Sequence, residues 1–220
     1  MAVKVKICGV RTPAVIEAAA EAGADFVGLV LFSRSPRQVE VEAARVLAAV
    51  AKSRLGTVVV LVDPDDALID EVVERVRPDL LQLHGAETPE RVAVIKARSG
   101  LRVMKAIAVA GAGDVAKADA YTGSADYVLF DSKAPAGTIL PGGNGVVFDW
   151  RALTTAKAPF ALSGGLTPDT VGEAILLTGA ALVDVSSGVE RGPGEKDLAL
   201  VRRFIQAAKA AAPRVRAKAS

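Results

Sequence analysis

The stretch 160-FALSGGLTPDTVGEAILLTGAALVDVSSG-188 decides the fold of this chain. Two short apolar runs, 160–165 and 181–188, flank an Ala- and Leu-rich segment. The runs predict strands that are buried on both faces, as in a parallel sheet. The segment between them predicts a helix, with Thr167 as N-cap, Pro168 in the first turn and Gly179 at the C-cap. A strand, a helix and a second strand in this order form one unit of an α/β fold.

The same alternation continues along the whole chain. Eight strand-like runs are predicted at 3–9, 25–32, 57–63, 80–85, 102–109, 127–132, 160–165 and 181–188. Helices are predicted at 12–24, 41–53, 64–78, 88–100, 167–180 and 195–210, with a shorter one at 148–157. Eight such units in 220 residues indicate a single-domain (β/α)₈ barrel. An open doubly wound sheet is the alternative, but no Gly-x-Gly-x-x-Gly follows the first strand.

Composition excludes several classes of protein. Half of the chain (51%) is hydrophobic, and 27 basic residues nearly balance 25 acidic ones, so no nucleic-acid or anionic-membrane partner is expected. One cysteine cannot form an internal disulfide. The N-terminal residues alternate between apolar and polar side chains, as in a strand, and show no secretory pattern. We therefore expect a cytoplasmic protein, with a barrel over 1–212 and a disordered basic tail over 213–220.

Polar residues follow most of the predicted strands. In barrel enzymes the active site lies at the C-terminal ends of the strands, so these residues are expected on one rim. They are Cys8, Arg37, Asp63, His84, Asp131, the pair Gly164 and Gly165, and the pair Ser187 and Gly188.

The last two loops are predicted to bind phosphate. Gly164 and Gly165 precede a predicted helix, and Ser187 and Gly188 follow the eighth strand. Glycines let backbone N–H groups approach an anion, and barrel enzymes often hold phosphate on the loops after strands seven and eight. Each pair alone is equally well explained as a tight turn.

Each of the other rim residues has a structural alternative. Cys8 fits a small buried side chain as well as a catalytic base, and Lys6 on the same strand face could favour its thiolate. Asp131 fits a cap or an ion pair, and Asp63 fits a turn or N-cap.

The two remaining rim residues are also ambiguous. His84 fits a hydrogen-bonded structural role, and Arg37 fits a solvated charge. With one histidine and one cysteine, no metal site is expected.

The chain resembles the phosphoribosylanthranilate isomerase family of tryptophan biosynthesis. The matching blocks are "KICGVRTP", "GADFVGLVLFSRSPRQV", "LLQLHG", "FDSKAPAGTILPGGNGVVFDW", "FALSGGLTPDTV" and "VDVSSGVERGPGEKD", which together cover nearly the whole sequence. Departures are mild: Ala14 and Val15 stand where the family often has an acidic residue, and "LSGGL" replaces "LAGGL".

The resemblance implies a (β/α)₈ barrel that catalyses an Amadori rearrangement without cofactor or metal. N-(5-phosphoribosyl)anthranilate would be converted to 1-(2-carboxyphenylamino)-1-deoxy-D-ribulose 5-phosphate by a monomer or homodimer. Cys8 would be the general base, Asp131 the general acid, and Arg37 the partner of the anthranilate carboxylate. A thiol starts near pKa 8.5, so a modest lowering is expected to supply thiolate. Further substrate contacts are predicted from His84, Gly143, Asn144 and Asp184.

Two other functions are alternatives to this one. Another phosphate-binding barrel, such as the histidine-pathway ribosyl isomerase or thiamin phosphate synthase, is disfavoured. In the first of these families the catalytic pair is two aspartates, where this chain has Cys8 and Asp131. A barrel that only binds a phosphosugar would keep the glycine loops and have no use for those two residues.

Overall fold

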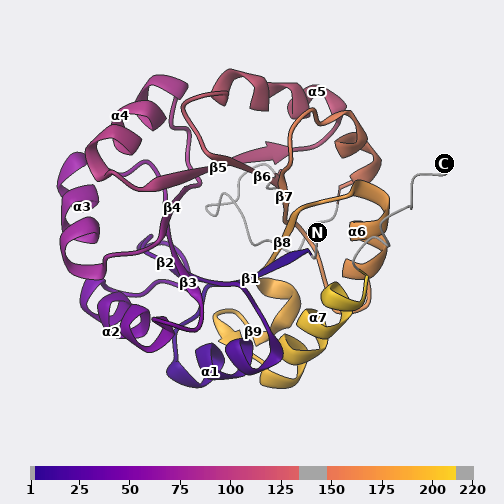
Figure 1. Ribbon diagram of the computed structural model, residues 1–220, viewed down its shortest axis with the longest axis horizontal. Coiled ribbons are helices and arrows are strands. Elements are labelled where there is room, and N and C mark those ends of the chain that lie inside the picture. The colour runs from indigo at the N-terminus through magenta and orange to yellow at the C-terminus, as the bar shows by residue number, and fades with distance from the viewer. Residues whose placement is uncertain (1–2, 134–147, 212–220) are drawn as a thin grey trace, which may run out of the picture.

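The centre of the molecule is a closed barrel of eight parallel strands (Figure 1). The computed structural model describes residues 3–133 and 148–211. Each strand pairs with the next along the chain, and β8 pairs with β1 to close the barrel. The strands are β1 Lys4–Cys8, β2 Phe26–Val30, β3 Gly56–Leu61, β4 Leu80–Leu83, β5 Arg102–Val109, β6 Tyr127–Ser132, β7 Ala161–Leu162 and β8 Leu182–Val185. The predicted fold class is confirmed.

Helices form a ring around the barrel (Figure 1). Two of them change type along their length: α3 continues as a π-helix, and α5 as a 3₁₀-helix. The helices are α1 Pro13–Ala22, α2 Val41–Ala51, α3 Asp66–Glu71 with η1 Val72–Val76, α4 Pro89–Ser99, α5 Ala112–Val115 with η2 Ala116–Tyr121, η3 Trp150–Thr155, α6 Val171–Thr178 and α7 Leu198–Ala210.

Local capping follows the sequence at several helix ends. Gly23 and Gly179 adopt the left-handed conformation that ends α1 and α6, as predicted. The prediction of Thr167 as an N-cap is wrong, because residues 168–170 form a turn and α6 begins at Val171. Asp63 lies in a turn at φ 46°, while Asp65 caps α3 by accepting from Leu68 N.

Two elements were not predicted. Residues 112–121 form α5 and η2 after the fifth strand. A hairpin of β9 Glu190–Gly192 and β10 Glu195–Lys196 follows β8 and the 3₁₀-helix η4 Ser187–Val189. This hairpin lies beside the site described below.

Side chains alternate between the barrel interior and the helix layer. On β1, Val5 and Ile7 join the core between strands and helices, whereas Cys8 packs with Val30 and Val60 in a separate interior cluster. The remaining interior is filled by an apolar layer of Val58, Leu80, Met104, Ala106, Leu129, Ala161 and Leu182. Burial on both faces explains the continuous apolar runs in the sequence.

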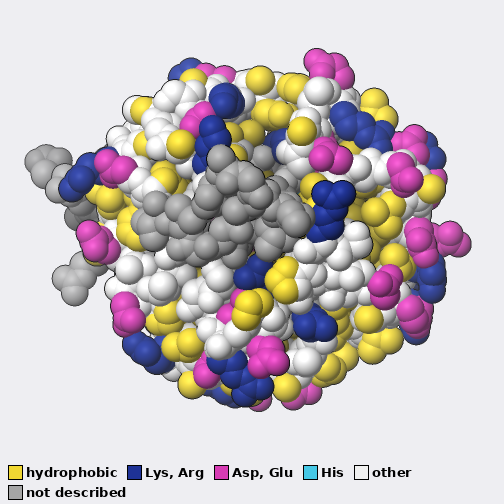
Figure 2. Space-filling view, turned by 180° about the vertical axis from the view of Figure 1, so that it is seen from behind, with side chains coloured by type: hydrophobic (Ala, Val, Ile, Leu, Met, Phe, Trp, Pro, Cys, Tyr) yellow, Lys and Arg dark blue, Asp and Glu magenta, His cyan; other side chains and the backbone are white. Residues whose placement is uncertain are grey.

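The surface carries both signs of charge. Figure 2 shows basic and acidic side chains interspersed over one end of the molecule, without a sector of one sign. Among the described residues, no helix is long and apolar enough to cross a membrane. The predicted tail 213–220 and the predicted contacts Gly143 and Asn144 lie outside the described residues.

Candidate active site

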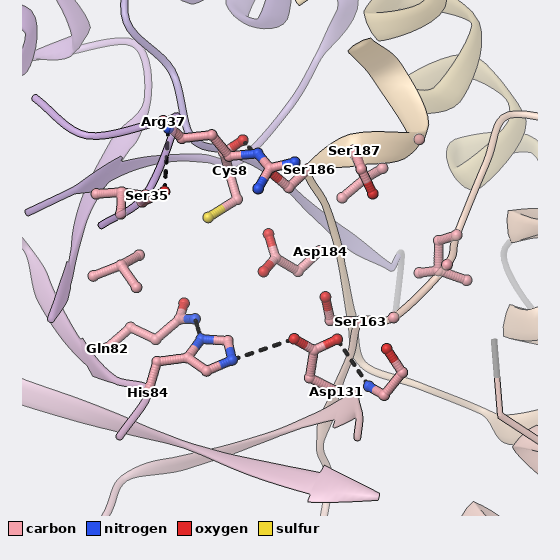
Figure 3. Close-up of a pocket in the computed structure, with 18 of the residues that line it drawn as sticks. Cys8, Ser35, Arg37, Gln82, His84, Asp131, Ser163, Asp184, Ser186 and Ser187 are labelled. Atoms are coloured by element: carbon pink, nitrogen blue, oxygen red, sulfur yellow. Dashed lines mark hydrogen bonds and ion pairs between the residues drawn. The ribbon is translucent and has the colours of Figure 1, made fainter. Parts of the chain in front are cut away.

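One pocket opens at the C-terminal ends of the barrel strands (Figure 3). Its lining brings together every site residue predicted within the described chain except Asp63, which belongs to the loop contacts of residues 85–87. The predicted residues in the lining are Cys8, Arg37, His84, Asp131, Gly164, Gly165, Asp184, Ser187 and Gly188. Figure 3 shows Cys8 and the carboxylates of Asp131 and Asp184 directed into the same space.

The wall formed by β1 and β8 holds the thiol beside an ion pair. Lys6 is fully buried, and its Nζ lies 3.0 and 3.1 Å from the two carboxylate oxygens of Asp184. Gly28 on β2 makes room for this group: a Cβ there would lie 2.9 Å from Cys8 Sγ and 3.1 Å from Lys6 Nζ. A buried lysine and aspartate are stable here because each compensates the charge of the other.

The surroundings of the Cys8 thiol shift its pKa in opposite directions, and burial has the larger effect. Burial raises the pKa of Cys8, and the nearby Lys6 ammonium opposes this shift without cancelling it. For Lys6, burial alone would lower the pKa, but attraction to Asp184 and Cys8 raises it above its ordinary value. Lys6 therefore acts in the predicted direction, whereas the prediction of a lowered thiol pKa is wrong.

Asp131 occupies the opposite wall, at the end of β6. Its Oδ1 accepts from Ser132 N at 2.8 Å, and its Oδ2 lies 3.2 Å from His84 Nε2. The other ring nitrogen, Nδ1, lies 3.1 Å from Gln82 Nε2. Gln82, His84 and Asp131 thus form a chain of hydrogen bonds along the pocket wall (Figure 3). His84 therefore has hydrogen-bond partners within the protein, as the structural alternative requires, and its contact with the substrate stays a prediction.

Arg37 is held in place by the hairpin after β8. Its Nε and Nη2 donate to the two carboxylate oxygens of Glu190 at 2.8 and 2.9 Å. Lys196, whose side chain is 1% exposed, donates to Glu190 Oε1 at 2.7 Å and to Ser186 Oγ at 3.1 Å. Ser186 Oγ in turn donates to the carbonyl of Cys8 at 3.1 Å. Arg37 is therefore a fixed, buried group and not a solvated charge.

The two glycine loops pack against each other. Gly164 and Gly165 have φ values of +87° and +64°, which favour glycine, and their N–H groups have no hydrogen-bond acceptor among the described residues. A Cβ on Gly188 would lie 1.9 Å from the carbonyl oxygen of Leu166, so the loop after β8 must carry glycine there. Unpaired N–H groups at close-packed glycines can bind an anion.

Several residues of the site were missed from the sequence. Gln82 lies on β4 two residues before His84, which directly follows the strand. Because side chains two residues apart in an extended chain share a face, this spacing could have indicated Gln82 as a site residue. Glu190 and Lys196 flank the turn "RGPGE", whose glycines and proline signal a hairpin. Among the described residues, no group of three or more His, Cys, Asp or Glu side chains is placed to hold a metal ion.

Comparisons with known proteins agree with the fold and the site geometry. The family model described as N-(5'phosphoribosyl)anthranilate (PRA) isomerase matches residues 5–207. The N-(5'-phosphoribosyl)anthranilate isomerase of Parvibaculum lavamentivorans is 53% identical over 216 residues, covering 96% of this chain and all of that one.

Solved structures share both the fold and the sequence. The phosphoribosyl anthranilate isomerase of Thermotoga maritima superposes with a TM-score of 0.86 at 35% identity, covering 94% of this chain and 99% of that one. A phosphoribosyl anthranilate isomerase in complex with reduced 1-(o-carboxyphenylamino)-1-deoxyribulose 5-phosphate has a TM-score of 0.81 at 32% identity, with the same coverage. The chain belongs to the N-(5'-phosphoribosyl)anthranilate isomerase family.

Proposed function

We propose that Cys8 and Asp131 are the base and the acid of the isomerisation that defines this family. The chain is an isomerase of tryptophan biosynthesis that converts N-(5-phosphoribosyl)anthranilate to the corresponding aminodeoxyribulose phosphate. The observation that carries the assignment is the position of the two groups: a thiol on β1 and a carboxyl on β6 point into one pocket from opposite walls (Figure 3).

The reaction requires two groups of this kind. Asp131, in its acid form, protonates the furanose ring oxygen, and the C1'–O bond breaks as the anilino nitrogen, keeping its hydrogen, forms a protonated imine. The imine acidifies the C2' hydrogen, which the Cys8 thiolate removes to give an enolamine. The ketone forms when the enol oxygen loses its proton and C1' gains one. The Asp131 carboxylate can accept the enol proton and the Cys8 thiol can give its proton to C1', so both groups return to the starting state and the protons balance.

Lys6 and Asp184 support the thiol in this proposal. Burial keeps Cys8 protonated in most molecules near neutral pH, because the raised pKa disfavours the charged form. When the thiolate forms, the Lys6 ammonium is next to it and compensates its charge. Asp184 keeps Lys6 charged at this position, at 3.0 Å.

The two anionic ends of the substrate are assigned to two regions of the rim, the glycine loops and Arg37. The phosphate is proposed to bind the N–H groups of Gly164, Gly165, Ser187 and Gly188, supported by their packing and by the positive φ values of the first pair. Arg37 is proposed to face the anthranilate carboxylate because it lines the same pocket. That contact would have to be added to the Glu190 ion pair or displace it.

A turnover assay tests the function directly. The purified protein, dialysed against a chelator, should consume N-(5-phosphoribosyl)anthranilate, since the proposed mechanism uses no metal and no cofactor. A protein that binds the substrate without consuming it would be a phosphosugar-binding barrel. We further propose a cytoplasmic location, in line with the single cysteine and the pathway's soluble substrate.

A further inference from the structure

Gln82 presents a buried polar atom that the known reaction does not use. The residue is 1% exposed and lines the pocket from β4. Its Nε2 is committed to His84 Nδ1, while its Oε1 has no hydrogen-bond partner among the described residues. A buried acceptor without a partner is unfavourable and calls for an explanation.

The direction of these hydrogen bonds defines one protonation state. An amide N–H that donates to Nδ1 makes this nitrogen an acceptor, so the ring proton is on Nε2. Nε2–H then donates to Asp131 Oδ2, so this oxygen carries no proton, and Oδ1 accepts from Ser132 N, an arrangement that suits a carboxylate. The His84–Asp131 pair carries one proton in this state, and Asp131 has none to give.

A general acid needs the pair to carry a second proton. In that state Nδ1 bears hydrogen, and the other proton is shared between Nε2 and Asp131 Oδ2. Nδ1–H then requires an acceptor, and Gln82 Nε2 cannot be one. A half-turn of the amide about its last side-chain bond would bring Oε1 to this place and give the unpartnered atom a partner.

We propose that Gln82 is a positioning residue whose turned amide accepts the Nδ1–H of His84 and thereby lets Asp131 hold the proton for ring opening. The inference rests on the proposed role of Asp131 as the acid. Gln82 touches no reacting atom in this scheme and acts through His84.

Other charged groups near the pair bear on its titration and are present in every variant used below. From the barrel interior these are Asp184 with its partner Lys6, and Cys8 on the opposite wall. Around the loops after β2, β3, β4 and β6 they are Arg37, Asp63, Glu87 with its partner Lys105, and Lys133.

The chain offers a clean probe, because His84 is its only histidine. In protein labelled with ¹⁵N-histidine, the two nitrogen shifts report the state of Nδ1 and Nε2 without assignment. Wild type is compared with Gln82→Met, which keeps the size but removes donor and acceptor, and with Gln82→Glu, which keeps only an acceptor. Each is measured across pH alongside kcat/KM.

As the pH falls, we expect Nδ1 to gain its proton over the same range in which kcat/KM recovers from its decline at high pH. In Gln82→Met each protonation state loses one amide hydrogen bond, but the Nδ1–H bond of the doubly protonated pair is the stronger, charge-assisted one, so both midpoints should move to lower pH. In Gln82→Glu both should move to higher pH. KM should change little.

Two results would overturn the inference. One is a wild-type Nδ1 that stays unprotonated wherever the protein is active. The other is a fall in kcat at all pH values in Gln82→Met with both midpoints unmoved, which would indicate a packing role. The histidine titration is independent of turnover. If the wild type did not turn over the substrate, or if Asp131→Asn were fully active, the result would instead count against the proposed function.

Discussion

Removal of the Cys8 thiol should slow turnover by orders of magnitude while leaving the barrel folded. Cys8 is 8% exposed and packs in a small cluster with Val30 and Val60. Cys8→Ala deletes one heavy atom, which corresponds to about 1 kcal/mol of lost burial. A domain with roughly 5–15 kcal/mol of stability tolerates that change.

The loss of activity should be far larger than the loss of stability. A positioned general base contributes on the order of 10²–10⁴-fold, equivalent to about 3–5 kcal/mol in the barrier. Cys8→Ser is the matched control, because it keeps the shape but replaces the thiol by a hydroxyl that is much harder to deprotonate. Both variants should therefore be slow, and both should keep the wild-type circular dichroism spectrum.

The assay follows the disappearance of N-(5-phosphoribosyl)anthranilate at saturating concentration, with the thermal unfolding midpoint measured on the same samples. A Cys8→Ala protein with near-normal kcat would refute the base assignment. It would leave Cys8 as a buried side chain that fills the space beside Gly28.

Three further outcomes follow from the site. Alkylation of Cys8 by iodoacetamide should accelerate with pH through a midpoint above that of an ordinary thiol, because burial raises the pKa of Cys8; a midpoint below that of an ordinary thiol would contradict the desolvated thiol. Arg37→Ala should lower kcat/KM by roughly ten- to a hundredfold, the range for a charge-assisted hydrogen bond, with Arg37→Lys recovering part and Glu190→Gln losing less; unchanged kinetics in all three would remove Arg37 from the site. A crystal soaked in sulfate should hold an anion at Gly165 and Gly188, and an anion bound elsewhere with these loops empty would argue against the phosphate site.

Much of the architecture could be predicted because it depends on local patterns. Continuous Val- and Leu-rich runs indicated strands buried on both faces, and glycine at positions such as Gly23 and Gly179 indicated helix ends. Once the strands were placed, the barrel geometry brought Cys8 and Asp131 to one rim, although 123 residues separate them in sequence.

The remainder depended on contacts that the sequence does not encode locally. Arg37 and Glu190 are 153 residues apart, and their pairing appears only when the hairpin after β8 folds back over the rim. The thiol pKa was misjudged for the same kind of reason: Lys6 is visible as a neighbour on the strand, whereas desolvation depends on everything packed around Cys8.

The start of α6 was also misplaced. The sequence "TPDT" fits an N-cap at Thr167, but Thr167 N donates to Thr170 Oγ1 at 3.0 Å, and residues 168–170 form a turn instead. Threonine side chains can satisfy turn and helix N–H groups alike, so the competing turn could not be excluded from the sequence.

The most direct test of the account separates the two proton transfers. The open-chain imine of anthranilate with 4-deoxyribose 5-phosphate has no ring oxygen, so it needs no acid to open a furanose. Asp131→Asn should fail with the natural substrate but convert this imine at a rate near that of the wild type. Cys8→Ala should fail with both compounds. If Cys8→Ala converts the imine as fast as the wild type, or if Asp131→Asn is equally impaired with both compounds, the assignment of Cys8 as base and Asp131 as acid is wrong.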